Sequence, residues 1–479
     1  MVGRKQEQET INRLVHSKKS EFLAIYGRRR VGKTFLVTSY FKDTFSFKHT
    51  GLSPYDTTAR ISLTDQLQAF YYSLLRYGLA EDKPSPKSWL EAFYLLEQLL
   101  ESQPKRGGKK IVFLDELPWM DTPRSKFLSA FESFYNGWAS GRGDILLIVC
   151  GSSSSWILKN LINNRGGLYN RITCQIKLVP FTLRECEAYF QSNQLLLNRY
   201  DITRAYMALG GIPYYLSYFE PGLSVEQNID KLFFSETAPL RNEFQRLFQS
   251  LFAHSENYVR LIEFLAKRNE GFSRDEIVDG LEITSGGGLS DMLGKLEESD
   301  FIERYKPVQL EGDEEDHYRI KDCFCLFFLR FVHKRKINDY HYWENVLSSR
   351  QISTWVGLAF EQVCRNHIDS IKRGLGISGV ATRQSSLIIR GDGQRTGTQV
   401  DLVLERADRI VNLCEMKFSA AEFMVEKDYD ITLRNRIERV RELLKKQQTL
   451  FLTLITTYGL KYNSYSGIFQ KVLTLDDLF

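Results

Sequence analysis

The stretch with the clearest chemical meaning is GRRRVGKT at residues 27–34. It matches the spacing G-x-x-x-x-G-K-[S/T], and it follows the apolar run FLAIY and precedes the helix-like run FLVTSYF. In a loop between a strand and a helix, successive backbone N–H groups surround a phosphate, a lysine adds positive charge and a threonine hydroxyl binds magnesium. The stretch therefore predicts a nucleoside-triphosphate site formed by Gly27, Arg28, Arg29, Arg30, Val31, Gly32, Lys33 and Thr34.

A second chemical signal is a pair of carboxylates after the apolar run IVFL, in KKIVFLDELPWM. A run without polar residues is typical of a buried parallel strand, and ligands lie beyond the carboxyl ends of such strands. We expect Asp115 to hold magnesium through water and Glu116 to act as general base toward the attacking water. A third strand, DILLIVCGSSSSW, ends near Ser152, whose hydroxyl either contacts the γ-phosphate or the attacking water or belongs to an ordinary serine-rich turn.

Six segments in a fixed order resemble one family, the prokaryotic AAA-type ATPases related to STAND proteins and called "archaeal ATPases". They are GRKQEQETINRL, YGRRRVGKT, FLDELPW, CGSS, NRGGLYNRI and LGGIPYYL. The resemblance implies ATP with magnesium as cofactors, and it places Gly3 and Arg4 near the adenine. It also implies that residues 210–213 open a helix of a lid over the nucleotide. Arg165 or Arg171 is the implied arginine finger, although Arg171 is equally well a surface or helix-capping residue.

The three consecutive arginines of the loop need a separate interpretation. Because the backbone N–H groups of such a loop turn inward, we expect the side chains of Arg28, Arg29 and Arg30 to point outward or along its rim. There they raise the positive potential of the site mouth, and they meet an acidic neighbouring subunit, a nucleic-acid phosphate or only solvent.

Residues 240–335 have a different pattern. ENYVRLIEFLAKRN places Tyr258, Leu261, Ile262 and Leu265 on one helix face, and Ser273 with Glu276 forms a capping box for a second helix. A third helix from about residue 289 and two strands joined by an acidic loop complete a predicted winged helix-turn-helix. Its third helix offers Lys295 against four carboxylates, so packing or coupling is a better expectation for it than reading DNA bases.

The last block carries a possible metal centre. RTGTQVDLVLERADRIVNLCEMKFS predicts a hairpin that turns near residue 408, which sets Asp401 opposite Glu415, with Lys417 on the same strand face as Glu415. Asp401 and Glu415 would bind magnesium, Lys417 would orient or activate the attacking water, and Glu361 of a preceding helix would complete the metal shell.

This Asp–x13–Glu–x–Lys pattern resembles the restriction-endonuclease-like core written PD-(D/E)xK, with Val400 in place of the proline. The tail, including VLTLDDLF, also resembles the uncharacterised C-terminal domain that accompanies this ATPase family. A surface ion pair gives the same pattern, and binding without cleavage is the alternative to catalysis. The following helical segment holds Arg434, Arg436, Arg439, Arg441, Lys445 and Lys446, which would either follow a phosphate backbone or form a solvated, salt-bridged helix.

Length and composition agree with a multidomain globular protein of 479 residues, 43% hydrophobic and 26% charged, with a net charge of +5. The seven scattered cysteines favour the cytoplasm, and no apolar run approaches the roughly 20 residues of a membrane span. The predicted fold is α/β: a P-loop NTPase core with an AAA-type parallel sheet at 1–178, a helical lid at 179–239, a winged helix-turn-helix at 240–335 and an α/β restriction-endonuclease-like domain at 345–479.

We expect an ATP-hydrolysing enzyme that couples its nucleotide state to a tail that binds or cuts nucleic acid with magnesium. The main alternative is a slow nucleotide-dependent switch whose tail only recognises a partner, and a weaker one is a DNA-binding regulator. ATP and ADP are the expected partners, with DNA or another nucleic acid and a second copy of the chain as further candidates.

Overall fold

The computed structural model describes residues 1–54, 61–104, 107–307, 315–335, 339–389, 391, 397–442 and 447–479. The chain divides into two compact units. The first comprises residues 1–180 with the short segments 247–255 and 298–300, and the second comprises the rest. The main part of the first unit therefore ends two residues past the predicted end of the ATPase core at 178. Most of the predicted lid, winged helix-turn-helix and C-terminal domain lies in the second unit.

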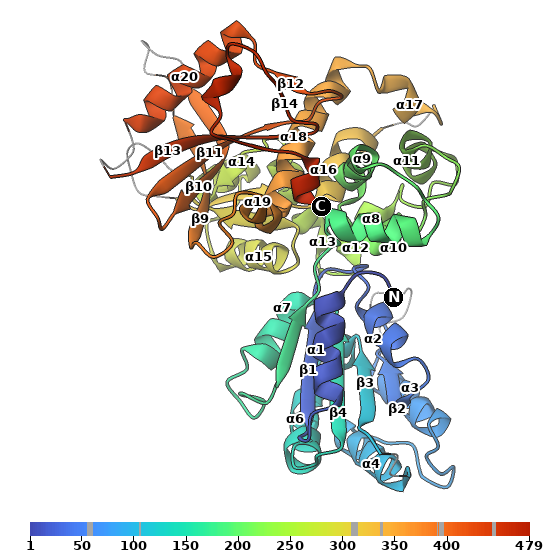
Figure 1. Ribbon diagram of the computed structural model, residues 1–479. Helices are drawn as coiled ribbons and strands as arrows, with labels where there is room; N and C mark the ends of the chain where they lie inside the picture. The colour runs from blue at the N-terminus through green and yellow to red at the C-terminus, as the bar shows by residue number, and fades with distance from the viewer. Residues whose placement is uncertain are drawn as a thin grey trace. The chain divides into compact units, whose positions relative to one another are not determined.

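The first unit is built on a parallel five-stranded sheet in the order β2-β3-β4-β1-β5 (Figure 1). Its three central strands are buried along their whole length, as their unbroken apolar sequences predict. The strands are β1 (Glu21–Tyr26), β2 (Phe45–Thr50), β3 (Lys110–Asp115), β4 (Ile145–Gly151) and β5 (Cys174–Lys177).

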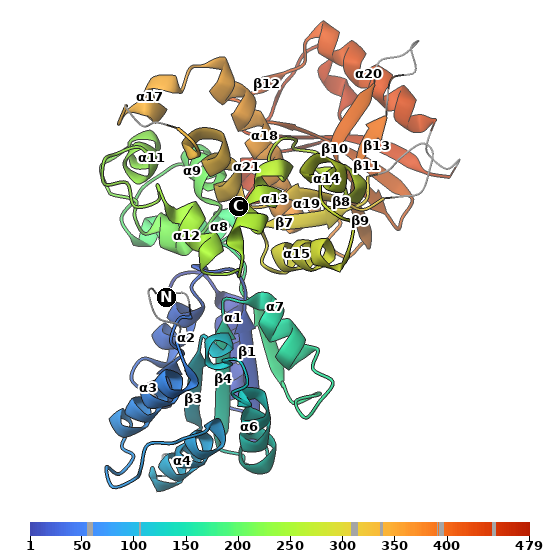
Figure 2. The ribbon, with the colours of Figure 1, turned by 180° about the vertical axis from the view of Figure 1, so that it is seen from behind.

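Helices cover both faces of this sheet (Figures 1 and 2). One face packs a phenylalanine-rich core against α3, α4, α6 and α7, while α1 and α2 bury Ile11, Leu14, Leu36 and Val37 on the other side. The bounds are α1 (Lys5–Val15), α2 (Lys33–Phe41), α3 (Leu63–Arg76), α4 (Trp89–Ser102), α5 (Leu117–Met120), α6 (Phe127–Phe134), η1 (Tyr135–Ala139), α7 (Ser154–Ile157) and η2 (Leu158–Ile162). The β1–α2, β3–α5 and β4–α7 junctions lie at one edge of the sheet, because parallel strands end together.

The second unit begins with helices: α8 (Leu183–Ser192), α9 (Arg199–Leu209), α10 (Pro213–Leu216), α11 (Val225–Phe233) and α12 (Glu243–Gln249), whose last residues fall in the first unit. Three helices and a three-stranded antiparallel sheet follow: α13 (Ser255–Leu265), β6 (Phe272–Ser273), α14 (Arg274–Leu281), α15 (Gly287–Glu298), β7 (Ile302–Tyr305) and β8 (His317–Ile320). The predicted apolar face of α13 is buried, and the Ser273–Glu276 capping box is present on α14. Most of the predicted acidic loop, residues 308–314, lies outside the described residues.

The C-terminal part of this unit is a five-stranded mixed sheet in the order β15-β13-β11-β10-β9. Its strands are β9 (Thr382–Ile389), β10 (Thr398–Arg406), β11 (Ile410–Lys417), β13 (Thr449–Thr456) and β15 (Lys471–Leu473), and a two-stranded sheet pairs β12 (Phe423–Met424) with β14 (Leu460–Lys461). The remaining elements are α16 (Cys323–Phe327), η3 (Phe328–Val332), α17 (Tyr342–Val346), α18 (Arg350–Asn366), α19 (Ile368–Gly374), α20 (Lys427–Arg441), η4 (Ser466–Ile468) and α21 (Leu475–Leu478). Leu433 and Val440 of α20 pack on one sheet face, and the ring of Phe360 in α18 packs at a tilt against that of Phe418, just after β11. In none of the described helices is there a stretch long and apolar enough to cross a bilayer.

Candidate nucleotide site and carboxylate centre

The loop between β1 and α2 has the backbone that its glycines predict. Gly27 has φ 139°, and a Cβ there would lie 2.2 Å from the Leu178 carbonyl oxygen, so only glycine fits. Gly32 has φ 92° and forms the N-cap of α2. Arg30 adopts a left-handed conformation, with φ 72°. The loop thereby directs the N-terminus of a helix toward the site, which is where an anion binds.

Lys33 lies inside this loop and is 5% exposed. Its Nζ donates hydrogen bonds to the carbonyl oxygens of Gly27 (2.8 Å) and Arg28 (2.9 Å). Burial lowers the pKa of the Lys33 ammonium, although the carboxylates of Glu116 and Asp115 oppose that shift. A phosphate entering the loop would offer this ammonium a full negative charge in place of two carbonyl dipoles.

The side chain of Arg28 departs from the sequence prediction. It is buried, with 2% exposed, so it does not point outward, whereas Arg29 and Arg30 are half-buried. Arginine is rarely buried this deeply in proteins, which is why the sequence favoured the rim. Arg4, predicted near the adenine, is also buried and donates to the carbonyl oxygens of Val31 (3.2 Å) and Val179 (2.6 Å), so it anchors the phosphate loop.

Asp115 and Thr34 meet at the predicted magnesium position. The Thr34 hydroxyl lies 3.1 and 3.0 Å from the two Asp115 carboxylate oxygens, and the Cys150 thiol donates to Asp115 Oδ1 at 2.6 Å. A hydroxyl and a carboxylate are hard oxygen donors of the kind that magnesium prefers, and both lie beside the loop. The donor set therefore fits the ion that accompanies a nucleoside triphosphate.

Glu116 is positioned by Ser152, the residue that directly follows the neighbouring strand β4. The Ser152 amide donates to Glu116 Oε2 at 2.9 Å, and the Ser152 hydroxyl donates to Glu116 Oε1. Ser152 is thus engaged with the predicted general base, an interaction that sequence reasoning missed. Glu116 has φ 47°, a left-handed backbone that a glutamate adopts only at some energetic cost.

Arg171, one of the two candidate arginine fingers, does not lie in this site. Arg165 and Arg171 are exposed and precede β5, which runs parallel to β1, so Arg171 lies near the amino ends of the strands. There the Arg171 charge lies near the Tyr135 hydroxyl and partly opposes the rise in the Tyr135 pKa that burial causes. The phosphate loop is at the other end of β1, about 20 Å away for a strand of six residues. A finger role for Arg171 would therefore require a neighbouring subunit.

The C-terminal hairpin has the predicted register. Leu402 pairs with Cys414 and Val403 with Leu413, so the next pair toward the open end is Asp401 with Glu415. The pairing of β10 with β9 shifts between Val400 and Val403, a bulge that changes the direction of the side chains beside it.

Glu415 is 8% exposed and its carboxylate is already engaged. Lys417 Nζ lies 2.8 Å from Oε1, the Tyr429 hydroxyl donates to the same oxygen, and Arg436 of α20 donates to Oε2. The cations Lys417 and Arg436, with hydrogen bonds from Lys417 and Tyr429, hold the pKa of Glu415 below its ordinary value despite its burial. Tyr429 and Arg436 were not among the predicted site residues.

Glu361 and Asp401 border a small cavity with space for about one water molecule, about 10 Å³. Burial and the charge of Asp401 raise the pKa of Glu361 to about 8, so Glu361 is protonated at neutral pH. Gln399 Nε2 donates to Asp401 at 2.8 Å and to Glu270 at 2.9 Å. The remaining lining includes Glu270, Arg319, Arg365 and the buried Ser386 hydroxyl, none of which the sequence analysis selected. The three carboxyl groups of Glu270, Glu361 and Asp401, the amides and this hydroxyl suit a small hard cation, whereas the guanidinium groups of Arg319 and Arg365 in the same lining oppose one.

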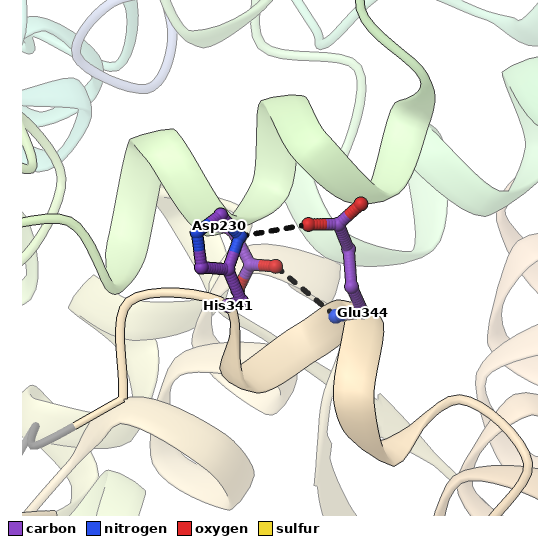
Figure 3. Close-up of side chains that lie close together, drawn as sticks. All are labelled: Asp230, His341 and Glu344. Carbon is purple, nitrogen blue, oxygen red and sulfur yellow. Dashed lines mark hydrogen bonds and ion pairs between the residues drawn. The ribbon is translucent and has the colours of Figure 1, made fainter.

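The predicted ligands Glu361, Asp401 and Glu415 are close enough to affect one another's charge, but they do not form a preassembled set. Within the described ranges, one group of three ligand-type side chains has all its ligand atoms within 4.8 Å of one another: Asp230, His341 and Glu344 (Figure 3). Asp230 accepts the backbone N–H groups of Trp343 (2.7 Å) and Glu344 (3.0 Å), and His341 Nδ1 pairs with Glu344 at 3.0 Å. We assign this group to capping of α17.

The basic residues of α20 do not form one exposed row. Arg436 points to Glu415 and Arg439 is buried, whereas Arg434 is exposed and paired with Asp430 at 2.8 Å. Arg441 is exposed, and Lys445 and Lys446 lie outside the described residues. On the described part of α20, two of the four predicted arginines therefore hold the fold together.

Comparison with known proteins identifies the first part of the chain. Residues 1–219 match the family described as an ATPase domain predominantly from Archaea. An uncharacterized protein of Methanocaldococcus jannaschii is 24% identical over 379 residues, which is 78% of each chain.

Among solved structures, a Walker-type ATPase of Pyrococcus abyssi is 18% identical, covers 69% of this chain and 96% of its own, and has a TM-score of 0.49. The ORC2 protein of Aeropyrum pernix, solved in ADPNP–ADP complexes, is 14% identical, covers 76% and 95%, and has a TM-score of 0.35. The family match over residues 1–219, together with the loop geometry, supports the conclusion that the chain is an ATPase.

Proposed function

We propose that this ATPase couples its nucleotide state to a C-terminal domain that binds or cleaves nucleic acid with magnesium. The observation that carries the proposal is the hairpin register, which pairs Leu402 with Cys414 and so sets Asp401 beside Glu415. The main elements around it are a helix, three antiparallel strands, a second helix and a strand parallel to the third, namely α18, β9, β10, β11, α20 and β13. The short elements α19 and β12 lie between α18 and β9 and between β11 and α20. This order supports an α/β restriction-endonuclease-like domain after a winged helix made of α13–α15 and β6–β8.

In the ATPase domain, each residue has a distinct role. Lys33 and the loop amides bind the phosphates, and Thr34 with Asp115 would hold magnesium, which neutralises charge on the phosphate oxygens when bound. Glu116 accepts a proton from the attacking water while the water oxygen bonds to the γ-phosphorus and the bond to the β-phosphate oxygen breaks. The hydrogen bonds from Ser152 orient Glu116 for this step.

In the C-terminal domain, Glu361 and Asp401 would hold the metal ion, with Glu415 joining them. The ion would supply charge stabilisation to a phosphodiester. Lys417, 2.8 Å from Glu415, is placed to orient or activate the attacking water. Glu361 would lose its proton as a cation entered, because the positive charge favours the ionised carboxylate.

A slow nucleotide-dependent switch with a binding-only tail is the second candidate. Glu415 favours it, since Lys417, Arg436 and Tyr429 already occupy its oxygens. In that case the tail recognises a partner, hydrolysis acts as a timer, and self-association or DNA contact depends on whether ATP or ADP is bound.

The test is magnesium-dependent conversion of supercoiled plasmid, with and without ATP. We expect nicking by wild type to fall at least 100-fold in Asp401→Ala and in Lys417→Ala, because each removes a group from the metal centre, while ATP hydrolysis stays within twofold. Asp408→Ala, in the exposed turn of the same hairpin, and Lys471→Ala are matched controls that should nick like wild type. Equal nicking by all five proteins would indicate a contaminant, and no nicking by wild type would favour the switch.

A further inference from the structure

A second cavity of the second unit is a groove of about 700 Å³, which we call the basic groove. Its walls come from α13, the loop after it, η3 with the residues that follow, and α18. Its floor is apolar and includes Phe264, Leu281 and Trp355. A volume of this size suits a ligand of a few linked groups rather than a folded partner.

The charged side chains of the basic groove are mainly cationic. Two carboxylates, Glu263 and Glu270, face six basic side chains: Arg260, Lys267, Arg268, Arg330, His333 and Lys334. Glu263 is itself neutralised, because its oxygens lie 2.7 Å from His333 Nε2 and 3.2 Å from Lys334 Nζ. The groove thus offers net positive charge to an occupant.

The cations divide into structural and available ones. Arg260 donates to the Leu281 carbonyl oxygen at 2.6 Å, and Arg268 pairs with Glu276 at 2.6 Å, so both shape the groove. Lys267, Arg330 and Lys334 are exposed. Across the described ranges, Arg330 and Lys267 lie within ion-pair distance of no carboxylate, and Lys334 keeps 73% of its side chain in solvent. Lys267 and Arg330 can therefore meet anionic groups directly, and Lys334 can do so by turning away from Glu263.

The basic groove adjoins the carboxylate cavity. Asn269 and Glu270 line both, and Glu270 joins Asp401 through the Gln399 amide. An anionic chain lying along the groove as far as Asn269 would therefore end beside the cavity of Glu361 and Asp401. An acidic peptide satisfies the charge but has no reason to approach a metal centre suited to phosphodiesters.

We propose that the basic groove binds a single strand of nucleic acid, whose phosphates contact Lys267, Arg330 and Lys334 and whose path leads to the carboxylate cavity. The path of the strand toward the carboxylate cavity rests on the proposed nuclease-like function. The binding of an anionic strand by the groove does not, because it follows from the positive charge of the lining. A single strand fits because its backbone bends into a concave site, whereas a duplex is too wide and stiff for one.

The test is fluorescence anisotropy of a labelled 20-nucleotide single strand with the full chain in EDTA, so that cleavage plays no part. Neutralising the three cations (Lys267→Ala, Arg330→Ala and Lys334→Ala together) should weaken binding at least tenfold at about 150 mM salt. It should also reduce the slope of log K against log salt by about 2, which is about 0.7 per lost phosphate contact. The matched control is Lys231→Ala, Lys461→Ala and Lys471→Ala together, which removes the same charge from exposed positions outside the groove and should bind like wild type.

Several outcomes would overturn the groove assignment: equal binding by the two triple variants, tighter binding of the matching duplex, or displacement of the strand by an equal charge of polyglutamate. ATP hydrolysis and the melting temperature check that each variant is folded. Binding that depends on the groove cations, without any plasmid nicking, would support the groove assignment and reject the nuclease. Nicking and strand binding that both persist in the groove variant would support the nuclease and reject the groove assignment.

Discussion

At the scale of single residues, the proposed general base Glu116 is held in a costly backbone conformation. Glu116 has φ 47° and ψ 47°, a backbone that costs a side-chain-bearing residue on the order of 1–3 kcal/mol. The two hydrogen bonds from Ser152 fix the carboxylate of this residue at the end of β3. A strained residue kept in place by its neighbours is typical of an active site, and it agrees with the general-base role.

Glu116→Gln tests that role. We expect the steady-state rate of phosphate release to fall about 10²- to 10⁴-fold, because an amide cannot accept the proton of the attacking water. ATP binding, measured with a fluorescent analogue, should stay near wild type, since glutamine keeps the shape and still accepts from the Ser152 amide. Glu81→Gln, at an exposed position in the same unit, is the control. A rate within twofold of wild type would exclude Glu116 as the base.

At the scale of elements, two glycines in the helices α14 and α15 have different surroundings. A Cβ on Gly280, in α14, would lie 2.2 Å from a ring carbon of Phe264, whose ring also packs on Phe272. A Cβ on Gly294, in α15, would meet nothing within 4 Å. Gly280 therefore permits α14 to approach α13 closely, whereas Gly294 only weakens its own helix.

We expect Gly280→Ala to lower the free energy of unfolding by about 1–3 kcal/mol through overpacking. Gly294→Ala should raise it by roughly 0.5–1 kcal/mol, because alanine is the better helix former. Urea unfolding of both variants against wild type measures the difference, and each variant is the control for the other. Equal effects of the two substitutions would contradict the close packing of α14 on Phe264.

At the scale of the whole chain, a buried histidine ties an early helix of the second unit to a late one. His367 follows α18, and its Nε2 accepts the backbone N–H of Leu183 at the start of α8 (2.9 Å). Its Nδ1 lies 2.8 Å from the Val363 carbonyl oxygen, so that nitrogen carries the proton. Burial lowers the pKa of His367 to about 4, although the charge of Glu185 opposes the shift.

This histidine should make stability fall in mild acid. Its folded pKa of about 4 is below the unfolded value of about 6.5, so the unfolded chain binds the proton more readily between these values. The contribution is fully present above pH 6.5, and about 2 kcal/mol of it is lost by pH 5. His367→Gln retains a donor and an acceptor, and its urea midpoint should change less between pH 7 and pH 5. Exposed His16→Gln should keep the wild-type dependence, and parallel profiles for all three proteins would contradict the assignment.

The patterns that the sequence revealed are those encoded by neighbours along the chain. The glycine spacing around Lys33, the apolar strand before Asp115, the capping box at Ser273 and the hairpin register that pairs Leu402 with Cys414 are all local. A strand, a turn and a helix start each depend on a few consecutive residues, whose backbone preferences and side-chain alternation are readable without the fold. The family match over residues 1–219 agrees with the part of the chain where such signals were densest.

Only the tertiary structure decided which side chains meet across long separations. It buried Arg28, joined Ser152 to Glu116, placed Arg171 at the far end of β1, and brought Arg436 and Tyr429 to Glu415. It also placed Glu270 in the cavity of Glu361 and Asp401, with Gln399 as the bridge. These contacts depend on how whole elements pack. A charged residue gives the same local sequence pattern whether it faces solvent or a partner more than a hundred residues away. The sequence alone could therefore indicate which residues carry chemistry, but not which side chains contact them.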